Sequence, residues 1–572
     1  MIENKMVLNL GNYDSKIKGS FEKLKKERIV QRIRKHDHTV WKPQPTEIVN
    51  RLGWLHSPEE MMNNIVEMQA FVNEVRSEGF THALLLGMGG SSLAPEVFRH
   101  IFGVKAGYLD LAVLDSTTPG AVLSYARKLT PEKTLFIAST KSGGTVETLS
   151  FLKYFYNDAL KKVGKEKVGR HFIAITDPGS GLEALAKELN FRKIFLNDPN
   201  IGGRYSALSF FGLVPAGLVG VDLKKLLERA QQMANHSKES NYPVDGYNTG
   251  AKLGTIMGEL ARQGRDKVTF ITSQKIESFG SWVEQLIAES TGKEGVGILP
   301  VVSETILQPD EYSMDRIFVY LRFGDDTTYD EQVKFLIENG FPVVYINLRD
   351  EYDLGGEFFR WEMATAIAGY FLKINPFDQP NVEAAKILAR KMVAAYQRDS
   401  KLPEPEPDLK IDGINVFTDN KAINLKDALE KFLAKANPEE NGKGRSYVAI
   451  QAFIQHTSGA DAALHKLRTR IQKNYKLTTT VGYGPRFLHS TGQLHKGDGG
   501  NGLFIQITAD HPEDAPIPDK AGEETSSITF GVLALAQALA DRQALLDANR
   551  KVIRFHLSQD TLAGIRKLSE AL

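Results

Sequence analysis

Histidine and hydroxyl side chains gather in one glycine-rich stretch late in the chain, GPRFLHSTGQLHKGDGGNG, which begins at Gly484. Its two histidines, His489 and His495, suit proton transfer because the ordinary pKa of histidine lies near neutrality. The pair lacks the i, i+4 spacing of a helical zinc site, so we expect no metal here. Taken alone, the stretch fits either a catalytic base or a polar loop. We expect His495 to have a structural role or to be a secondary contact of the substrate.

A glycine turn, LLLGMGGSSLAPEVF, follows the first strongly apolar run. Glycine permits a tight turn, and the helix that follows offers free N–H groups to an anion or a sugar hydroxyl. We therefore expect Gly89, Gly90 and Ser91 to contact a ligand. A dinucleotide fingerprint needs a third glycine where Ser92 stands. A purely structural strand-to-helix turn is the other interpretation.

A second turn, FIASTKSGGTVETL, joins another apolar run to a helix that starts near Val146. Hydroxyls, backbone amides and one ammonium group at a helix start form a phosphate-binding nest. It is not a Walker A loop, because its lysine precedes the glycines. The alternative is a capped helix beside a solvated lysine. The predicted phosphate ligands are Ser139, Thr140, Lys141, Ser142 and Thr145.

Five motifs in order resemble the sugar-isomerase (SIS) domain proteins, and among them the glucose-6-phosphate isomerase family. The likeness covers about residues 53–386. The segment HTVWKPQPTEIVNRLGWL and the late position of FLHSTGQ are similar to the isomerase half of transaldolase–isomerase fusions. Too few residues precede HTVWKP in this sequence to form a transaldolase domain. We therefore expect no transaldolase activity. The motifs are GMGGSSL, STKSGGTVET, NIGGRYSALSFFGLVPAGL, VEQLIAESTGK and LKINPFDQPNVEAAK.

The resemblance implies site residues beyond the two turns. It implies that Glu289 is the base that moves a proton between C1 and C2, that Arg204 stabilises the enediolate, and that Gln379 binds substrate. It implies ring opening by His489, with Lys386 as a cationic partner at the ring oxygen. Histidine and carboxylate suit these tasks, and no cofactor or metal is required.

The implied activity is the reversible isomerisation of glucose 6-phosphate and fructose 6-phosphate, in glycolysis and gluconeogenesis. Two alternatives are an isomerase that also accepts mannose 6-phosphate and a sugar-phosphate-binding regulator without turnover. The resemblance also implies a homodimer in which a neighbouring chain delivers the histidine. The late position of FLHSTGQ leaves open whether His489 serves its own chain.

The elements that must position these residues form an α/β protein with parallel sheets covered by helices, because continuous apolar runs alternate with amphipathic stretches. The helix FGVLALAQALADRQALL is typical of core packing. We predict five segments: an N-terminal helical or extended wrap, a first SIS domain with the phosphate loop, a second SIS domain with Glu289 and Lys386, a linker, and a C-terminal α/β region with the histidine loop, at 1–52, 53–235, 236–400, 401–413 and 414–572.

Composition restricts the partners. The 572 residues carry 71 Lys and Arg against 70 Asp and Glu, a formal charge of +1, which gives no general affinity for nucleic acid or for an anionic membrane. The chain has no cysteine, which rules out disulfides and thiolate chemistry. No apolar run is long enough for a membrane span, and the first residues lack the pattern of a secretory signal. We expect a cytoplasmic protein that binds a small sugar phosphate.

Overall fold

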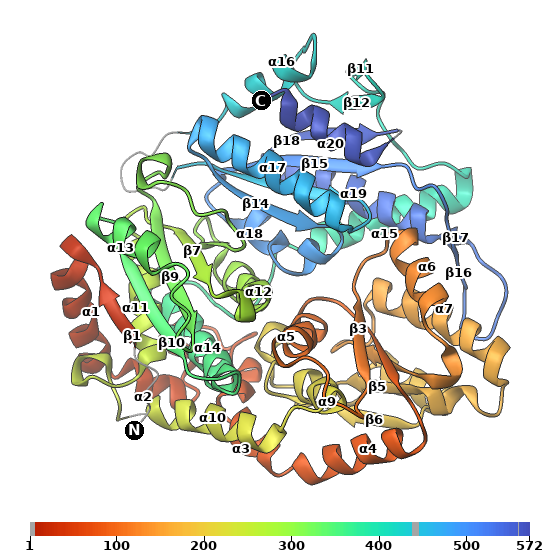
Figure 1. The fold of residues 1–572 in the computed structure, drawn as a ribbon, viewed down its shortest axis with the longest axis horizontal. Coiled ribbons are helices and arrows are strands. Elements are labelled where there is room, and N and C mark those ends of the chain that lie inside the picture. Colours follow the sequence, from red (N-terminus) through yellow and green to blue (C-terminus); the bar gives the residue numbers. More distant parts are fainter. Residues whose placement is uncertain (1–5, 239, 438–444, 559) are drawn as a thin grey trace.

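A computed structural model describes residues 6–238, 240–437, 445–558 and 560–572. Three sheets, each built around parallel strands and flanked by helices, lie in three lobes around the centre of the molecule (Figure 1). This is the predicted α/β class. None of the helices in the described ranges is long and apolar enough to cross a membrane.

The first sheet has the order β3-β2-β4-β5-β6 and is parallel throughout. The chain moves from β2 to β3 on one side and returns to β4 on the other, so the strand order reverses between β2 and β4. Ligands of open α/β sheets bind at such a reversal, beyond the carboxyl ends of the strands. The strands are β2 (His82–Gly87), β3 (Asp110–Leu114), β4 (Thr134–Ser139), β5 (Phe172–Thr176) and β6 (Lys193–Leu196).

Helices cover both faces of the first sheet and carry the two predicted turns at their starts. The apolar strands are buried on both sides, as expected for a parallel sheet. The helices are α4 (Ile65–Ser77), α5 (Leu93–Phe102), α6 (Pro119–Lys128), α7 (Val146–Val163), α8 (Gly181–Glu188) and α9 (Phe210–Val219).

The second sheet has the order β1-β10-β9-β7-β8. In addition to the expected helices, the N-terminal segment contributes strand β1, which pairs antiparallel with β10 at the sheet edge. The strands are β1 (Met6–Asn9), β7 (Lys267–Thr272), β8 (Leu299–Val301), β9 (Arg316–Phe323) and β10 (Val343–Leu348). The main helices are α1 (Asp14–Lys26), α2 (Ile29–Arg34), α10 (Leu223–His236), α11 (Thr249–Ala261), α12 (Phe279–Thr291), α13 (Asp330–Glu338) and α14 (Asp353–Leu372).

One apolar core runs through the first two lobes, whereas the third lobe has a core of its own. The third sheet has the order β11-β12-β18-β15-β13-β14, in which β12 pairs antiparallel with both of its neighbours and the remaining pairs are parallel. Four predicted C-terminal strands are confirmed, and Leu409–Ile411, inside the predicted linker, forms strand β11. The strands are β11 (Leu409–Ile411), β12 (Ile414–Phe417), β13 (Tyr447–Phe453), β14 (Thr478–Tyr483), β15 (Gly502–Ala509) and β18 (Lys551–Leu557).

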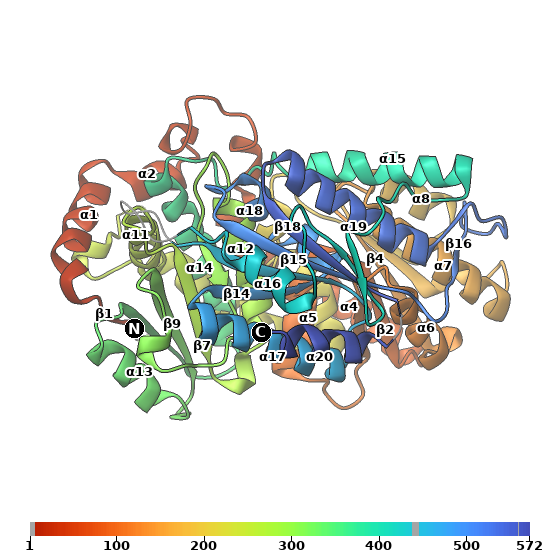
Figure 2. The ribbon, with the colours of Figure 1, turned by 90° about the horizontal axis from the view of Figure 1, so that it is seen from above.

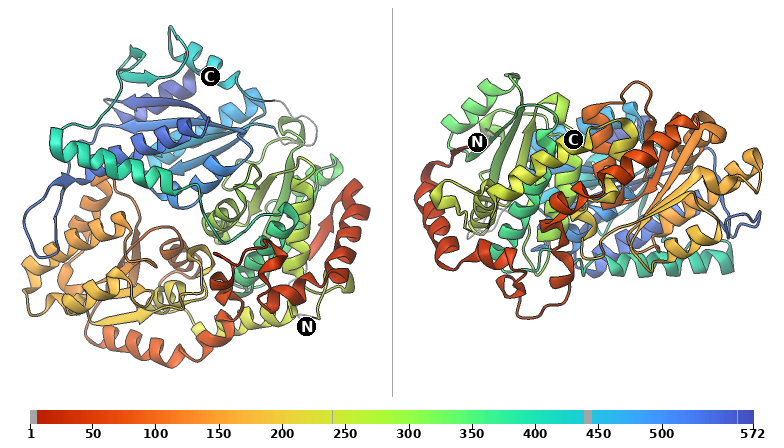
Figure 3. Two further views of the ribbon diagram at one scale, coloured as in Figure 1. Left: turned by 180° about the vertical axis from the view of Figure 1, so that it is seen from behind. Right: turned by 90° about the horizontal axis from the view of Figure 1, so that it is seen from below.

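Two features lock the third lobe onto the others. Helix α15 packs along α19 of the third lobe, although the sequence assigns it to the second domain (Figure 2). Seen from behind, it lies across the junction of the third and first lobes (Figure 3). The ribbon of β16 (Pro516–Ile517) and β17 (Ile528–Thr529) packs on α7 of the first lobe. The helices of this region are α15 (Glu383–Asp399), α16 (Leu425–Leu433), α17 (Ser458–Tyr475), α18 (Gly492–Gly497), α19 (Phe530–Asp547) and α20 (Thr561–Glu570).

Candidate active site

The two glycine turns lie side by side at the strand reversal, after β2 and β4. Gly89 has a φ of +54°, and a Cβ on it would lie 2.8 Å from Gln285 Nε2. A Cβ on Gly90 would lie 2.0 Å from the carbonyl oxygen of Gly203. Glycine is required at both positions because the first turn is wedged between the loops that carry Arg204 and His489.

The residues of the predicted phosphate loop fall into two groups, those that line the turn and those that lie beneath it. The hydroxyls of Thr140 and Thr145 are 2.9 Å apart, and Ser142 Oγ accepts from the amide of Gly144 at 3.3 Å. Ser139 is buried beneath the loop and donates to the carbonyl of Ser91 at 3.4 Å. Thr140, Ser142 and Thr145 therefore line the turn, while Ser139 and Ser91 support it from below.

Lys141 does not join this group in the structure. Its ammonium forms an ion pair with Asp177 and donates to the carbonyl of Pro199 at 2.9 Å. In this conformation the ammonium therefore points to Asp177 and not to the loop hydroxyls, and its role as a phosphate ligand stays a prediction. The opposite charge of Asp177, a partly buried carboxylate, attracts the flexible side chain of Lys141.

Arg204 joins three segments that are far apart in the sequence. Its buried guanidinium donates to Ser290 Oγ at 2.7 Å, to Gln379 Oε1 at 2.9 Å and to the carbonyls of Pro376 and Asp378. Its Nη1 also lies 3.2 Å from Glu289 Oε1. The structure thus brings Arg204, Glu289 and Gln379 together, as the sequence predicts.

Lys293 is a neighbour that the sequence analysis missed. It follows Glu289 by four residues in ESTGK, its side chain is buried, and Nζ lies 2.8 Å from Asp378 Oδ1. Burial, reinforced by the charge of Arg204, lowers the pKa of Lys293 to about 8. Its contact with Asp378 fixes the segment whose carbonyl receives Arg204.

The histidine loop reaches this group from the third lobe of the same chain. Gln285 Nε2 donates to the carbonyl oxygen of His489 at 2.7 Å and to Glu289 Oε2 at 2.9 Å. The Gln285 amide therefore links the predicted base to the predicted ring-opening histidine. In this chain His489 and Glu289 therefore lie on either side of one amide group.

Glu147, in the first turn of α7, is the second residue that the sequence analysis missed. His489 Nε2 lies 2.9 Å from its Oε1. Burial opposes the carboxylate charge, but His489 and a hydrogen bond from Gln537 outweigh it, and the pKa of Glu147 falls below its ordinary value. A carboxylate can only accept, so Nε2 carries the hydrogen and Nδ1 is left to exchange a proton. The signal was an acidic residue two positions after the STKSGGT turn.

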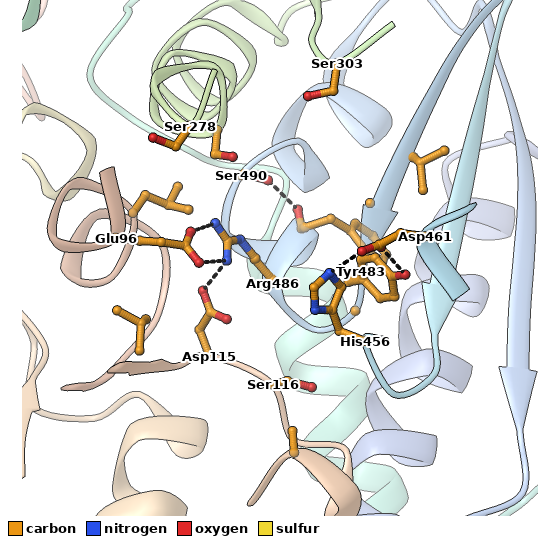
Figure 4. A pocket seen from close by; sticks show the side chains of 18 of the residues that line it. Glu96, Asp115, Ser116, Ser278, Ser303, His456, Asp461, Tyr483, Arg486 and Ser490 are labelled. Atoms are coloured by element: carbon orange, nitrogen blue, oxygen red, sulfur yellow. Dashed lines mark hydrogen bonds and ion pairs between the residues drawn. The ribbon is translucent and has the colours of Figure 1, made fainter. Parts of the chain in front are cut away.

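Arg486 anchors the histidine loop to the first lobe. Its guanidinium pairs with Glu96 of α5 and lies 3.2 Å from Asp115 Oδ2, at the end of β3. Figure 4 shows the three side chains meeting in a cavity of about 530 Å³ between the lobes. The loop is therefore fixed in front of Glu147 by an ion-pair cluster three residues before His489.

Lys386 is the predicted residue that stands apart. Its side chain is 52% exposed on α15, with Nζ 3.6 Å from Glu383 Oε2. It lines a cavity of about 500 Å³ together with Ser142, Thr145, Glu147 and His489. In this conformation the expected cationic partner at the ring oxygen lies at the wall of the cavity, bound to a neighbouring acid.

His495 is buried behind the site, next to Phe487 and Phe504. Burial lowers its pKa well below the ordinary value for histidine. Gln451 Nε2 lies 3.3 Å from its Nδ1. This is the structural position that the sequence predicts.

Across the described parts of the chain, no three His, Asp or Glu side chains are grouped to hold a metal ion.

Known proteins share this fold and parts of this sequence. Residues 42–301 match the model of the family described as phosphoglucose isomerase. The glucose-6-phosphate isomerase of Carboxydothermus hydrogenoformans is 29% identical over 396 residues, which cover 59% of this chain and 83% of that protein. The glucose-6-phosphate isomerase of Thermus thermophilus is 28% identical over 395 residues, which cover 60% of this chain and 90% of that protein.

A solved structure gives the same architecture. The glucose-6-phosphate isomerase from Chlamydia trachomatis superimposes with a TM-score of 0.58 at 18% identity, over 70% of this chain and 89% of that chain. At this identity the likeness shows the fold alone.

Proposed function

We propose that this chain, which carries a phosphoglucose isomerase domain at residues 42–301, interconverts glucose 6-phosphate and fructose 6-phosphate. The reaction is a step of glycolysis and gluconeogenesis. The observation that carries the proposal is the juxtaposition of Arg204, Glu289 and His489 beside the two turns at the strand reversal. A binding module without turnover needs the phosphate loop but not this acid–base set.

The phosphate is held by the hydroxyls of Thr140, Ser142 and Thr145 and by the start of α7, whose dipole favours an anion. This places the sugar ring in the cavity that His489 and Glu147 line. The negative charge of the substrate also offers Lys141 and Lys386 a partner other than Asp177 and Glu383.

Ring opening needs one group to take the hydroxyl proton and another to protonate the ring oxygen. His489 supplies the first through Nδ1, while Glu147 holds Nε2–H and stabilises the imidazolium that forms. Lys386 can supply the second once its half-exposed ammonium leaves Glu383, a contact that solvent weakens.

Proton transfer then uses one base on one face of the open sugar. Glu289 removes the C2 proton of the aldose and returns it to C1. Negative charge develops on the enediolate oxygens, and Arg204, which stays charged at every working pH, stabilises it from a buried position.

The test is direct turnover. The purified chain is supplied with fructose 6-phosphate in the presence of EDTA, and formation of glucose 6-phosphate is followed. Product at a rate that EDTA does not alter is expected. A rate at background would refute the isomerase, and loss of activity in EDTA would refute the metal-free route. Mannose 6-phosphate in a parallel assay decides the breadth of substrate.

A further inference from the structure

Helix α19 contributes one side chain to the site in addition to packing the core. Gln537 is 4% exposed, and both ends of its amide are bonded. Nε2 donates to Glu147 Oε1 at 2.6 Å, and Oε1 accepts from Thr117 Oγ1 at 2.8 Å. We infer that Gln537 is a positioning residue, which holds the Glu147 carboxylate so that Glu147 can orient the His489 ring. The inference rests on the proposed isomerase.

The amide has one orientation that satisfies both neighbours. Glu147 can only accept as a carboxylate, so the NH₂ group of Gln537 must face it. The carbonyl then faces Thr117, whose fully buried hydroxyl donates. Leucine at position 537 can make neither bond.

Two donors share one oxygen of Glu147. His489 Nε2 lies 2.9 Å from Oε1 and Gln537 Nε2 lies 2.6 Å from it, and both donors belong to the third lobe. Without the Gln537 donor the buried carboxylate keeps only one of these two side-chain donors and is less firmly held about its side-chain bonds. The imidazole then loses the fixed acceptor that sets its tautomer and its angle in the cavity. Buried polar groups left half-bonded also carry a cost.

The substitutions separate positioning from packing. Gln537→Leu removes both bonds. Thr117→Val removes only the bond that orients the amide. The matched control is Gln543→Leu, on the exposed side of the same helix, where the amide donates to Asp547. Circular dichroism and thermal unfolding check that each variant is folded.

Two substrates distinguish ring opening from later chemistry. Fructose 6-phosphate requires ring opening, whereas erythrose 4-phosphate does not. In erythrose 4-phosphate, the phosphate occupies the oxygen needed for ring closure. Gln537→Leu is expected to lower kcat for the hexose about 10- to 100-fold. The loss is smaller than the full contribution of general acid–base catalysis, because His489 itself is still present. Its KM and its rate with the tetrose should change little. Thr117→Val should give a smaller loss in the same direction, and Gln543→Leu none.

Nitrogen NMR of the imidazole gives a readout that does not depend on turnover. The His489 signals, assigned by their absence in His489→Ala, should move in Gln537→Leu and stay in place in Gln543→Leu. Unchanged signals and kinetics would overturn the inference, as would equal losses on both substrates or a change in KM alone. If the unaltered chain lacks hexose isomerisation, the proposed function fails while the NMR result still decides the role of Gln537. If Gln537→Leu fails to fold, the kinetics and NMR signals of Thr117→Val decide whether Gln537 is a positioning residue.

Discussion

Glu289 meets one cation and one amide donor. Arg204 Nη1 lies 3.2 Å from Oε1, and Gln285 donates to Oε2 at 2.9 Å, so both oxygens are fixed before substrate arrives. A base held in this way needs little reorganisation when it takes the proton.

Glu289→Gln should therefore bind substrate almost normally and lose turnover by about 100- to 10,000-fold, because the amide cannot carry the proton. Steady-state kinetics and a separate binding titration measure the two effects. Retained turnover would mean that another group is the base.

Glu284 precedes Gln285 on α12 and governs stability rather than chemistry. Burial, opposed by the charge of Arg486, raises its pKa from 4.5 to about 7. Between these values the folded chain binds more protons than the unfolded chain, so this group makes stability fall as pH rises.

Glu284→Gln does not titrate, so its free energy of unfolding should exceed that of the unaltered chain by about 1–3 kcal/mol at pH 8 and by much less at pH 5. Urea denaturation at the two pH values measures the difference. The exposed Glu406→Gln is the control. An equal gain at both pH values would show that ionisation of Glu284 is not the cause.

At the scale of elements, two helix ends act on the two carboxylates in opposite directions. Glu147 lies in the first turn of α7, where the helix dipole favours negative charge, and Glu289 lies in the last turn of α12, where it does not. The dipole thus helps to keep Glu147 ionised beside His489.

The turn after β2 must stay close to the Arg204 loop. In Gly90→Ala the new methyl group meets the Gly203 carbonyl at 2.0 Å and forces the two loops apart. We expect kcat/KM to fall about 100-fold, the usual cost of a shift near 1 Å in the reacting groups. Gly19→Ala on α1, where no heavy atom lies within 4 Å, is the control and should leave activity unchanged. Activity near normal in Gly90→Ala would show that the loops can separate without harm.

At the scale of the whole molecule, the third lobe brings His489 to Glu147 of the same chain, and Arg486 locks it there. The family resemblance implies a homodimer with shared sites, but the histidine here already has its partner within one chain. Whether two copies associate is therefore separate from whether the site is complete.

Two inactive variants, Glu289→Gln and His489→Ala, test whether the site is completed within one chain when they are produced together in one cell. Sites built within one chain gain nothing from mixing, so we expect the mixture to be as inactive as either variant alone. Recovered turnover in the mixture, measured against each variant, would show that chains exchange the histidine.

Local signals in the sequence determined the parallel α/β class, the two turns after buried strands and the grouping of Arg204, Glu289 and Gln379 implied by the family motifs. Apolar runs and glycine turns act within a few residues, so they can be recognised without the fold. The edge strand β1 and the packing of α15 on α19 could not be recognised in this way, because they depend on which surfaces meet.

Only the tertiary structure decided the partners of the charged groups. Glu147 and His489 are 342 positions apart, and Gln537 is 390 positions from Glu147. Lys141 pairs with Asp177, and Lys386, at the wall of the cavity, pairs with Glu383. The physical reason is that the orientation of a long polar side chain follows from the nearest opposite charge in space, and that distance is set by how the three lobes pack.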